Sequence, residues 1–150
     1  MAKGTKIINL ETADPAFRSA VLLEKIKLSG TVFSSRGDGK RFLELPWVKR
    51  QITEKLGFAP YAGTLNVKLT EESMKQRKLL EKAPSTKICP AEGYCNGQLF
   101  KAFIGILQCA IVVPEVAGYP KDLLEIIASV NLREALQLED DCEVEVTVNL

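Results

Sequence analysis

Apolar and polar residues alternate strictly in two segments of the chain. In residues 64–69 (TLNVKL) every second side chain is apolar, which leaves Thr64, Asn66 and Lys68 together on the opposite face. Residues 142–148 (CEVEVTV) alternate in the same way. A period of two residues is typical of a β-strand with one buried face. We therefore expect two strands here, and we expect the polar face of residues 64–69 to be open to solvent or to a ligand.

Short apolar runs bounded by glycine, proline or polar turn residues predict the remaining strands. These runs are residues 26–33, 41–45, 103–107, 109–113 and 123–128. Helical spacing predicts a leading helix over residues 14–25, a second helix over residues 47–56 that stops at Gly57, and a helical turn at residues 132–136. Residues 71–82 carry seven charges and fit a solvated helix or loop better than a binding face.

The order of these elements indicates a mainly β fold. Strands and helices do not alternate regularly, as they would in a doubly wound α/β protein. Many short strands with one or two short helices are typical of a small β-barrel. A chain of 150 residues has the usual size of one domain with its own core. We expect residues 28–150 to form the barrel and residues 1–27 to be an N-terminal extension with a short helix.

Charge is balanced overall but uneven along the chain. Lys and Arg total 20 against 19 Asp and Glu, for a net charge of +1, which argues against a protein that coats nucleic acid or an anionic membrane. Residues 36–55 hold six basic and three acidic side chains, whereas residues 138–150 hold five acidic and no basic ones. An anionic small ligand would therefore prefer the first of these regions.

Composition removes several kinds of chemistry. There is no histidine, so no imidazole can act as a general base, and a zinc site would need all four cysteines to converge. The sequence has neither an apolar signal segment nor an apolar run of 18 residues, so we expect a cytoplasmic protein. Its cysteines are then expected to be reduced thiols. The proximity of Cys89 and Cys95 leaves a redox pair as an alternative.

Three groups of residues have the composition of a phosphate-handling site. The segment SRGDGKR, residues 35–41, combines two glycines with cations, so its backbone N–H groups and charges suit an anion, although an ordinary hairpin loop has the same composition. Thr64 and Asn66 offer two neutral oxygens on one strand face, as Mg²⁺ accepts, although an exposed polar face explains them too. Glu125 interrupts an apolar run and faces either solvent or a ligand.

These segments together resemble the archaeal-type CTP-dependent riboflavin kinase family. The matching motifs are GDG at residues 37–39, LP at 45–46, LGFAPYAGTLNVKL at 56–69, AIVVP at 110–114, LEIIA at 124–128 and LRE at 132–134. The resemblance covers about residues 28–150, and the motif at 56–69 is its most specific part. It implies a cradle-loop β-barrel that transfers the terminal phosphate of CTP to the 5′-hydroxyl of riboflavin, giving FMN and CDP with Mg²⁺.

The resemblance also implies a role for individual residues. Thr64 and Asn66 would be the magnesium ligands, Ala117 and Glu125 would contact the flavin, and Glu125 is also the candidate for a catalytic base. The nucleotide would lie between two loops, whose residues are Arg36, Gly37, Asp38, Gly39, Lys40 and Arg41 in the first and Val130, Asn131, Leu132 and Arg133 in the second. Riboflavin, FMN, CTP and CDP are then the expected partners of a monomer that binds no nucleic acid and no membrane.

Two other functions remain open from the sequence. Ser35, Asn131 and Ala117 depart from the pattern of the family, which motivates a non-catalytic relative that binds a flavin or a nucleotide. Small barrels of this kind also occur in DNA-binding regulators, but the net charge of +1 and the lack of a long basic stripe disfavour that function. Phosphoryl transfer itself depends mostly on positioning and charge, so the absence of histidine is compatible with a kinase.

Overall fold

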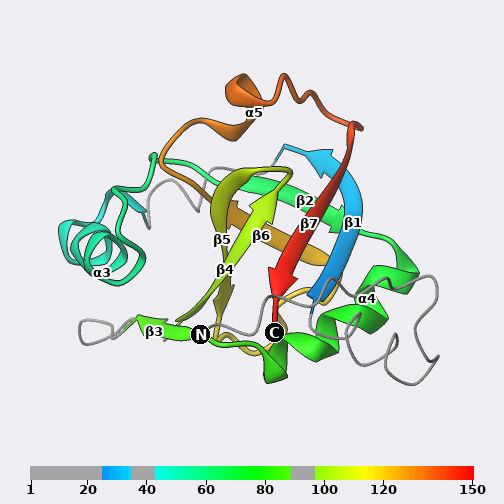
Figure 1. Cartoon of the computed structure of the whole chain (residues 1–150), viewed down its shortest axis with the longest axis horizontal. Coiled ribbons are helices and arrows are strands. Elements are labelled where there is room, and N and C mark those ends of the chain that lie inside the picture. Colours follow the sequence, from blue (N-terminus) through cyan, green and yellow to red (C-terminus); the bar gives the residue numbers. More distant parts are fainter. Residues whose placement is uncertain (1–24, 35–42, 89–96) are drawn as a thin grey trace, which may run out of the picture.

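Six antiparallel strands form a closed barrel in the computed structural model, which describes residues 25–34, 43–88 and 97–150. The strands are β1 (Lys25–Phe33), β2 (Leu65–Leu69), β4 (Gly97–Ile104), β5 (Leu107–Pro114), β6 (Leu123–Ile127) and β7 (Glu143–Asn149), and the short β3 (Thr86–Ile88) extends the sheet beside β4. Their order is β3-β4-β5-β6-β2-β1-β7, and pairing of Phe103 in β4 with Thr147 in β7 closes the barrel. The mainly β barrel expected from the sequence is confirmed (Figure 1).

Alternation along each strand sorts the side chains between the barrel interior and its outer surface. The interior is filled by buried aliphatic side chains from all six barrel strands, among them Leu28, Val67, Ile111, Ile126 and Val146. A second buried cluster lies outside the barrel, where outward-facing residues of β4, β5 and β6 meet a helix. This arrangement explains why parts of β5 and β6 are apolar on both faces.

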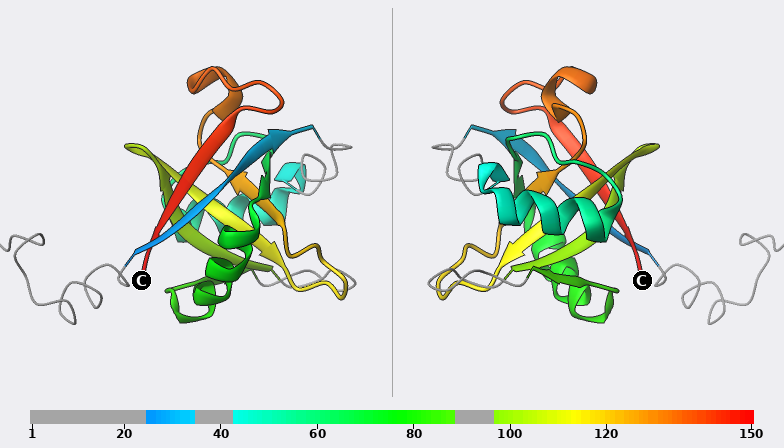
Figure 2. Two further views of the ribbon diagram at one scale, coloured as in Figure 1. Left: turned by 90° about the vertical axis from the view of Figure 1, so that its right-hand side faces the viewer. Right: turned by 90° about the vertical axis from the view of Figure 1, so that its left-hand side faces the viewer.

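That helix is α3 (Pro46–Leu56), which packs on the outer face of the sheet through Val48, Ile52 and Leu56 (Figure 2). Pro46 fits the first turn, where no backbone N–H is needed. The helix ends at Gly57, whose φ of 79° is left-handed, and the Gly57 N–H donates to the Thr53 carbonyl at 3.0 Å. The glycine stop expected from the sequence is confirmed.

The other helices lie at the two ends of the barrel (Figures 1 and 2). At one end, α4 (Glu71–Arg77) continues into the 3₁₀ helix η1 (Lys78–Lys82). The Thr70 hydroxyl caps α4 by accepting from the Ser73 N–H at 3.2 Å. At the other end is α5 (Leu132–Ala135), capped by Asn131. The described residues include no helix that is both long and apolar enough to cross a membrane.

Three sequence expectations need correction or lie outside the described residues. The strand expected at residues 41–45 is wrong where it is described: residues 43 and 44 are helical, and Leu43 is buried in the cluster around α3. The strand expected at residues 103–107 instead ends at Ile104, because Gly105, at a φ of 60°, and Ile106 form the turn to β5. The helix expected at residues 14–25 lies outside the described residues, apart from Lys25 in β1.

Candidate functional site

Thr64 and Asn66 present their side-chain oxygens to each other where the chain enters β2. The Thr64 hydroxyl donates to the Asn66 amide oxygen, with 3.1 Å between the two oxygens. The side chain of Asn66 lies on the outer face, as the alternation predicted, but the residue is only 5% exposed. The expectation of an open polar face is therefore wrong at Asn66. A buried amide with a fixed partner is better ordered than a solvent-exposed one.

This oxygen pair suits a small divalent cation. Adjacent ligands of an octahedral Mg²⁺, each about 2.1 Å from the metal, are about 3 Å apart. The separation of 3.1 Å between the two oxygens is close to that spacing. Both oxygens are neutral, so the negative charge that balances a cation would have to come from another group. The part of the chain that the structure describes contains no cluster of three or more Cys, Asp or Glu side chains with the geometry of a metal site.

A cavity of about 240 Å³ joins Thr64 to the second predicted nucleotide loop. It is lined by residues 61–65, Ile126, Ala128 and residues 130–133. The Tyr61 N–H donates to the Ala128 carbonyl at 2.8 Å, and the Asn131 amide donates to the Tyr61 hydroxyl at 3.2 Å. These bonds hold the loop before β2 against the loop after β6. The structure thus brings one predicted metal ligand and all four residues of the second loop to one cavity.

The four loop residues contribute to the cavity in different ways. Val130 is 40% exposed, so its side chain is available to a ligand, whereas the Leu132 side chain is buried in the barrel core. A ligand contact at Leu132 therefore falls to its backbone. Asn131 caps α5 by accepting from the Glu134 N–H at 3.3 Å. Arg133 supplies the cation of this loop.

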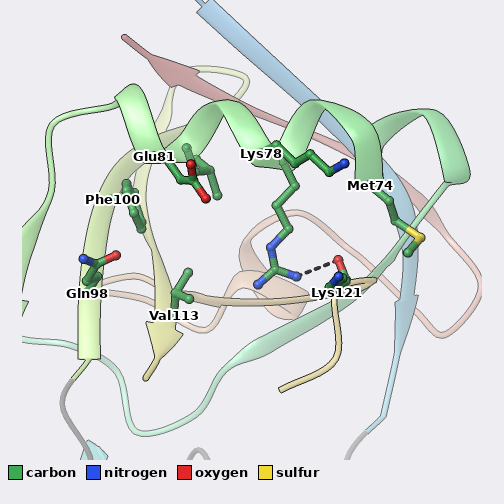
Figure 3. Close-up of a pocket in the computed structure, with 9 residues that line it drawn as sticks. Met74, Lys78, Glu81, Gln98, Phe100, Val113 and Lys121 are labelled. Carbon is green, nitrogen blue, oxygen red and sulfur yellow. Dashed lines mark hydrogen bonds between the residues drawn. The ribbon is translucent and has the colours of Figure 1, made fainter. Parts of the chain in front are cut away.

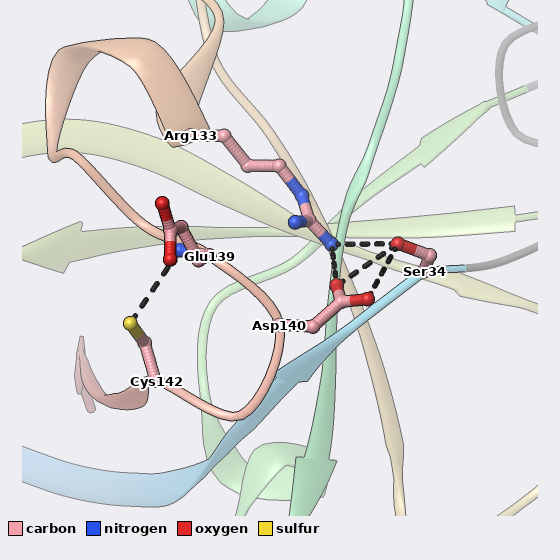
Figure 4. Close-up of polar contacts among 5 residues, drawn as sticks. All are labelled: Ser34, Arg133, Glu139, Asp140 and Cys142. Carbon is pink, nitrogen blue, oxygen red and sulfur yellow. Dashed lines mark hydrogen bonds and ion pairs between the residues drawn. The ribbon is translucent and has the colours of Figure 1, made fainter.

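Arg133 belongs to a polar cluster at the edge of this cavity (Figure 4). Its Nη2 atom lies 2.7 Å from Oδ1 of Asp140 and 3.3 Å from the Ser34 hydroxyl. The hydrogen bonds from Arg133 and Ser34 hold the pKa of Asp140 below its usual range. Ser34 lies two residues before the first predicted nucleotide loop, and that loop, residues 36–41, lies outside the described residues.

Glu125 lies beside Asn66 on the neighbouring strand. The two residues are direct partners in the antiparallel register of β2 and β6, so their side chains share the outer face. The Tyr119 hydroxyl donates to Oε2 of Glu125 at 2.9 Å. Burial, together with the charge of Glu125 and this hydrogen bond, raises the pKa of Tyr119. Glu125 is thus an oriented carboxylate next to the candidate metal ligand.

Arg77 acts on this carboxylate indirectly. It binds the connection between β5 and β6, which carries Tyr119, the hydrogen-bond donor to Glu125. Its Nη1 atom donates to three backbone carbonyls, those of Pro120 at 3.1 Å, Lys121 at 2.7 Å and Leu123 at 2.7 Å. Its guanidinium carbon lies 5.7 Å from the centre of the Tyr119 ring. Burial lowers the pKa of Arg77. The contacts fix the segment that carries Tyr119, and Ala117, the other predicted flavin contact, lies exposed in the same connection.

A larger cavity, of about 470 Å³, lies at the opposite end of the barrel (Figure 3). It is lined by Met74, Arg77, Lys78, Leu80, Glu81, Gln98, Phe100, Val113 and Lys121. None of the predicted site residues that the structure describes lines it. We place the candidate site at the smaller cavity because Thr64 and the loop cation Arg133 line it, and because Thr64 bonds to Asn66, the register partner of Glu125.

Sequence reasoning missed several residues that organise the site, among them Tyr61, Tyr119 and Asp140. Tyr61 had a signal, because it lies within the LGFAPYAGTLNVKL motif. Tyr119 and Asp140 had none, since each lies in a turn-rich connection whose path depends on the rest of the barrel.

Comparison with known proteins gives a consistent result. The family model CTP-dep_RFKase, described as "Domain of unknown function DUF120", matches residues 32–148. The chain is 36% identical over 145 residues to a protein named riboflavin kinase from Methanosarcina barkeri, covering 92% of this chain and 63% of that protein. It is 40% identical over 135 residues to a riboflavin kinase from Pyrobaculum aerophilum, covering 85% of this chain and 63% of that protein.

The aligned region covers most of this chain but a smaller share of each relative. It spans less than two thirds of the length of each of them. The family model, by contrast, includes every described residue of the candidate site, from Ser34 to Asp140. The chain belongs to the CTP-dependent riboflavin kinase family.

Proposed function

We propose that this protein is a CTP-dependent riboflavin kinase that transfers the terminal phosphate of CTP to the 5′-hydroxyl of riboflavin, yielding FMN and CDP. The proposal is supported by the position of the Thr64 and Asn66 pair between the cavity of residues 130–133 and Glu125. Thr64 lines the cavity shared with residues 130–133, while Asn66 is the direct neighbour of Glu125. A phosphate donor and a hydroxyl acceptor bound on these two sides would meet at the oxygen pair.

Each described residue has a defined task in this proposal. Tyr61 and residues 130–133 bind the nucleotide, and Arg133 offsets the charge of its phosphates. Thr64 and Asn66 would hold Mg²⁺, which when bound neutralises charge on the outer phosphates. Glu125, held by Tyr119, orients the flavin. The first loop, residues 36–41, is proposed to complete the nucleotide site on the basis of its sequence alone.

The reaction needs little covalent participation by the protein. The 5′-oxygen of riboflavin forms a bond to the terminal phosphorus of CTP, and the bond from that phosphorus to the bridging oxygen breaks. CDP leaves with the bridging oxygen, and the hydroxyl proton passes to an oxygen of the transferred phosphate, or to Glu125 if that carboxylate acts as a base. In-line placement of donor and acceptor accounts for most of the catalysis expected of such a site.

Product formation tests the proposal directly. The purified protein is incubated with riboflavin, MgCl₂ and CTP, and FMN is quantified by chromatography, with ATP, GTP and UTP as parallel donors. We expect FMN with CTP and at least tenfold less with the other donors. FMN formation from ATP as fast as from CTP would refute the donor assignment. Binding of riboflavin or CDP without any FMN would instead favour the non-catalytic relative.

The substitution Glu125→Gln separates the two roles that the sequence leaves open for this residue. A carboxylate that only orients the flavin raises the KM for riboflavin when it is replaced, with a small change in kcat. A carboxylate that accepts the hydroxyl proton lowers kcat by about 10²-fold or more. Steady-state kinetics with riboflavin as the varied substrate distinguish these results. We expect the KM effect, because Oε2 already accepts a hydrogen bond from Tyr119.

A further inference from the structure

Three side chains from separate segments meet at one nitrogen of Arg133. Arg133 comes from α5, Asp140 from the turn before β7, and Ser34 from the end of β1 (Figure 4). The Arg133 to Asp140 distance is 2.7 Å, and the Ser34 hydroxyl lies 2.9 and 3.1 Å from the two carboxylate oxygens of Asp140. Each member of the cluster therefore contacts both of the others.

The contacts engage one corner of the guanidinium group. Both Asp140 and Ser34 approach Nη2, whereas a guanidinium carries five N–H donors in a planar fork. A carboxylate bound at Nη2 fixes the plane of the guanidinium group. The N–H donors on another edge of that group can then form two parallel hydrogen bonds with a phosphate. Arg133 also lines the cavity that holds Thr64. The anchor thus determines how the cation faces that cavity.

Folding stability does not explain this cluster. The side chains of Arg133 and Asp140 are 33% and 53% exposed, and ion pairs this accessible to water contribute little to stability. Their position offers a better explanation. Ser34 lies two residues before the first predicted nucleotide loop, and Arg133 is the last residue of the second, so the cluster joins the strand end that leads to one loop to the cation of the other.

We propose that Asp140, oriented by Ser34, is a positioning residue that holds Arg133 ready for the phosphates of the nucleotide. The inference rests on the proposed function, because it takes the cavity at residues 130–133 to be the nucleotide side of the site. It assigns no contact between Asp140 and the substrate. Asp140 acts only through Arg133, and its removal should weaken nucleotide binding without altering the flavin side.

Replacing Asp140 changes nucleotide affinity in opposite directions, depending on whether the residue positions Arg133 or acts only through its negative charge. Removing a negative charge near an anion site strengthens anion binding if long-range electrostatics alone operate. Loss of the contact that holds Arg133 in place weakens anion binding instead. Asp140→Asn keeps the shape of the side chain and removes its charge. Glu139→Gln is the matched control, because it removes the same charge one residue earlier, at a position where the backbone N–H rather than the side chain contacts Cys142.

Isothermal titration of the full chain with CDP and MgCl₂, without riboflavin, measures the effect independently of turnover. We expect Asp140→Asn to weaken CDP binding by about five- to tenfold and Ser34→Ala to weaken it less, as for loss of a coupled polar contact. Glu139→Gln should bind CDP as tightly as the unaltered protein or more tightly. In kinetics, the KM for CTP should rise with Asp140→Asn, while kcat and the KM for riboflavin stay within about twofold.

A double-mutant cycle tests whether Asp140 acts through Arg133. In an Arg133→Ala background, Asp140→Asn should have no further weakening effect on CDP binding. CDP binding by Asp140→Asn that is equal to or tighter than that of the unaltered protein would overturn the inference, and so would an undiminished effect in the Arg133→Ala background. If CDP binds as expected but no FMN forms, the proposed function fails and the positioning role stands. If the unaltered protein binds no CDP, both fail.

Discussion

At the scale of single residues, the hydrogen bond from Tyr119 to Glu125 is the contact most directly tied to the acceptor side. Its length is 2.9 Å, and both partners are half-buried. A hydrogen bond to a charged group contributes about 1.5–3 kcal/mol. Tyr119→Phe removes the hydroxyl and keeps the ring over Arg77. The substitution therefore tests the bond rather than the packing.

We expect Tyr119→Phe to raise the KM for riboflavin by about tenfold, as loss of a hydrogen bond to a carboxylate implies. CDP affinity should not change, since Tyr119 does not line the cavity of residues 130–133. Initial rates at varied riboflavin concentration, together with CDP titration, check both statements. An unchanged KM for riboflavin would show that the hydrogen bond from Tyr119 to Glu125 does not contribute to riboflavin binding.

At Gly30, β1 passes close to the backbone of β2. A Cβ atom at Gly30 would lie 2.2 Å from the Lys68 carbonyl oxygen, which is backbone and cannot rotate away. We expect Gly30→Ala to lower the free energy of unfolding by about 2–4 kcal/mol, measured by urea denaturation. Gly97→Ala is the matched strand control, since its Cβ would have no neighbour nearer than 3.8 Å. Equal stability of the two variants would contradict the close approach.

The sequence predicts the site unevenly at this scale. Alternation put Thr64 and Asn66 on one face, because a strand fixes the direction of each side chain. It did not show that Asn66 is buried, since the neighbours that flank it, Phe33 and Glu125, come from strands far away in the sequence. Asp140 was unpredictable for a related reason. Its partner Ser34 is 106 residues away.

At the scale of secondary-structure elements, α3 is attached to the barrel by one apolar stripe. Val48, Ile52 and Leu56 recur at helical spacing and are buried against the outer face of the sheet. The sequence predicted this helix well, because proline, periodicity and glycine all indicate the same limits. It did not predict residues 43 and 44 as helical, because a short apolar run fits a strand or a buried helical turn equally well.

The packing of the apolar stripe of α3 should contribute measurably to the free energy of unfolding. Ile52 is fully buried, so Ile52→Ala should lower the free energy of unfolding by about 2–5 kcal/mol. Lys49→Ala, on the exposed face of the same helix, should change it by less than about 0.5 kcal/mol. Denaturant unfolding followed by circular dichroism compares the two variants. A loss below about 1 kcal/mol at Ile52 would contradict the packing described for α3.

At the scale of the whole molecule, barrel closure brings the parts of the site together. β2 lies between β1 and β6, and its register partners in β6 lie at least 55 residues further along the chain, the nearest pair being Lys68 with Leu123. The sequence identified most strands from local patterns, but the pairing order depends on contacts between distant segments. The resemblance to a known family implied a barrel, but the order of its strands comes from the structure.

The proposed kinase activity is tested most directly by comparing FMN formation by the unaltered protein and by Asn66→Ala, at equal protein concentration with CTP, riboflavin and MgCl₂. We expect FMN from the unaltered protein and a loss of at least about 10²-fold in kcat/KM for Asn66→Ala, because an oxygen ligand for the metal is removed. Circular dichroism should show that the variant is folded. Full activity in a folded Asn66→Ala protein would refute the metal site, and no FMN from the unaltered protein would refute the kinase activity.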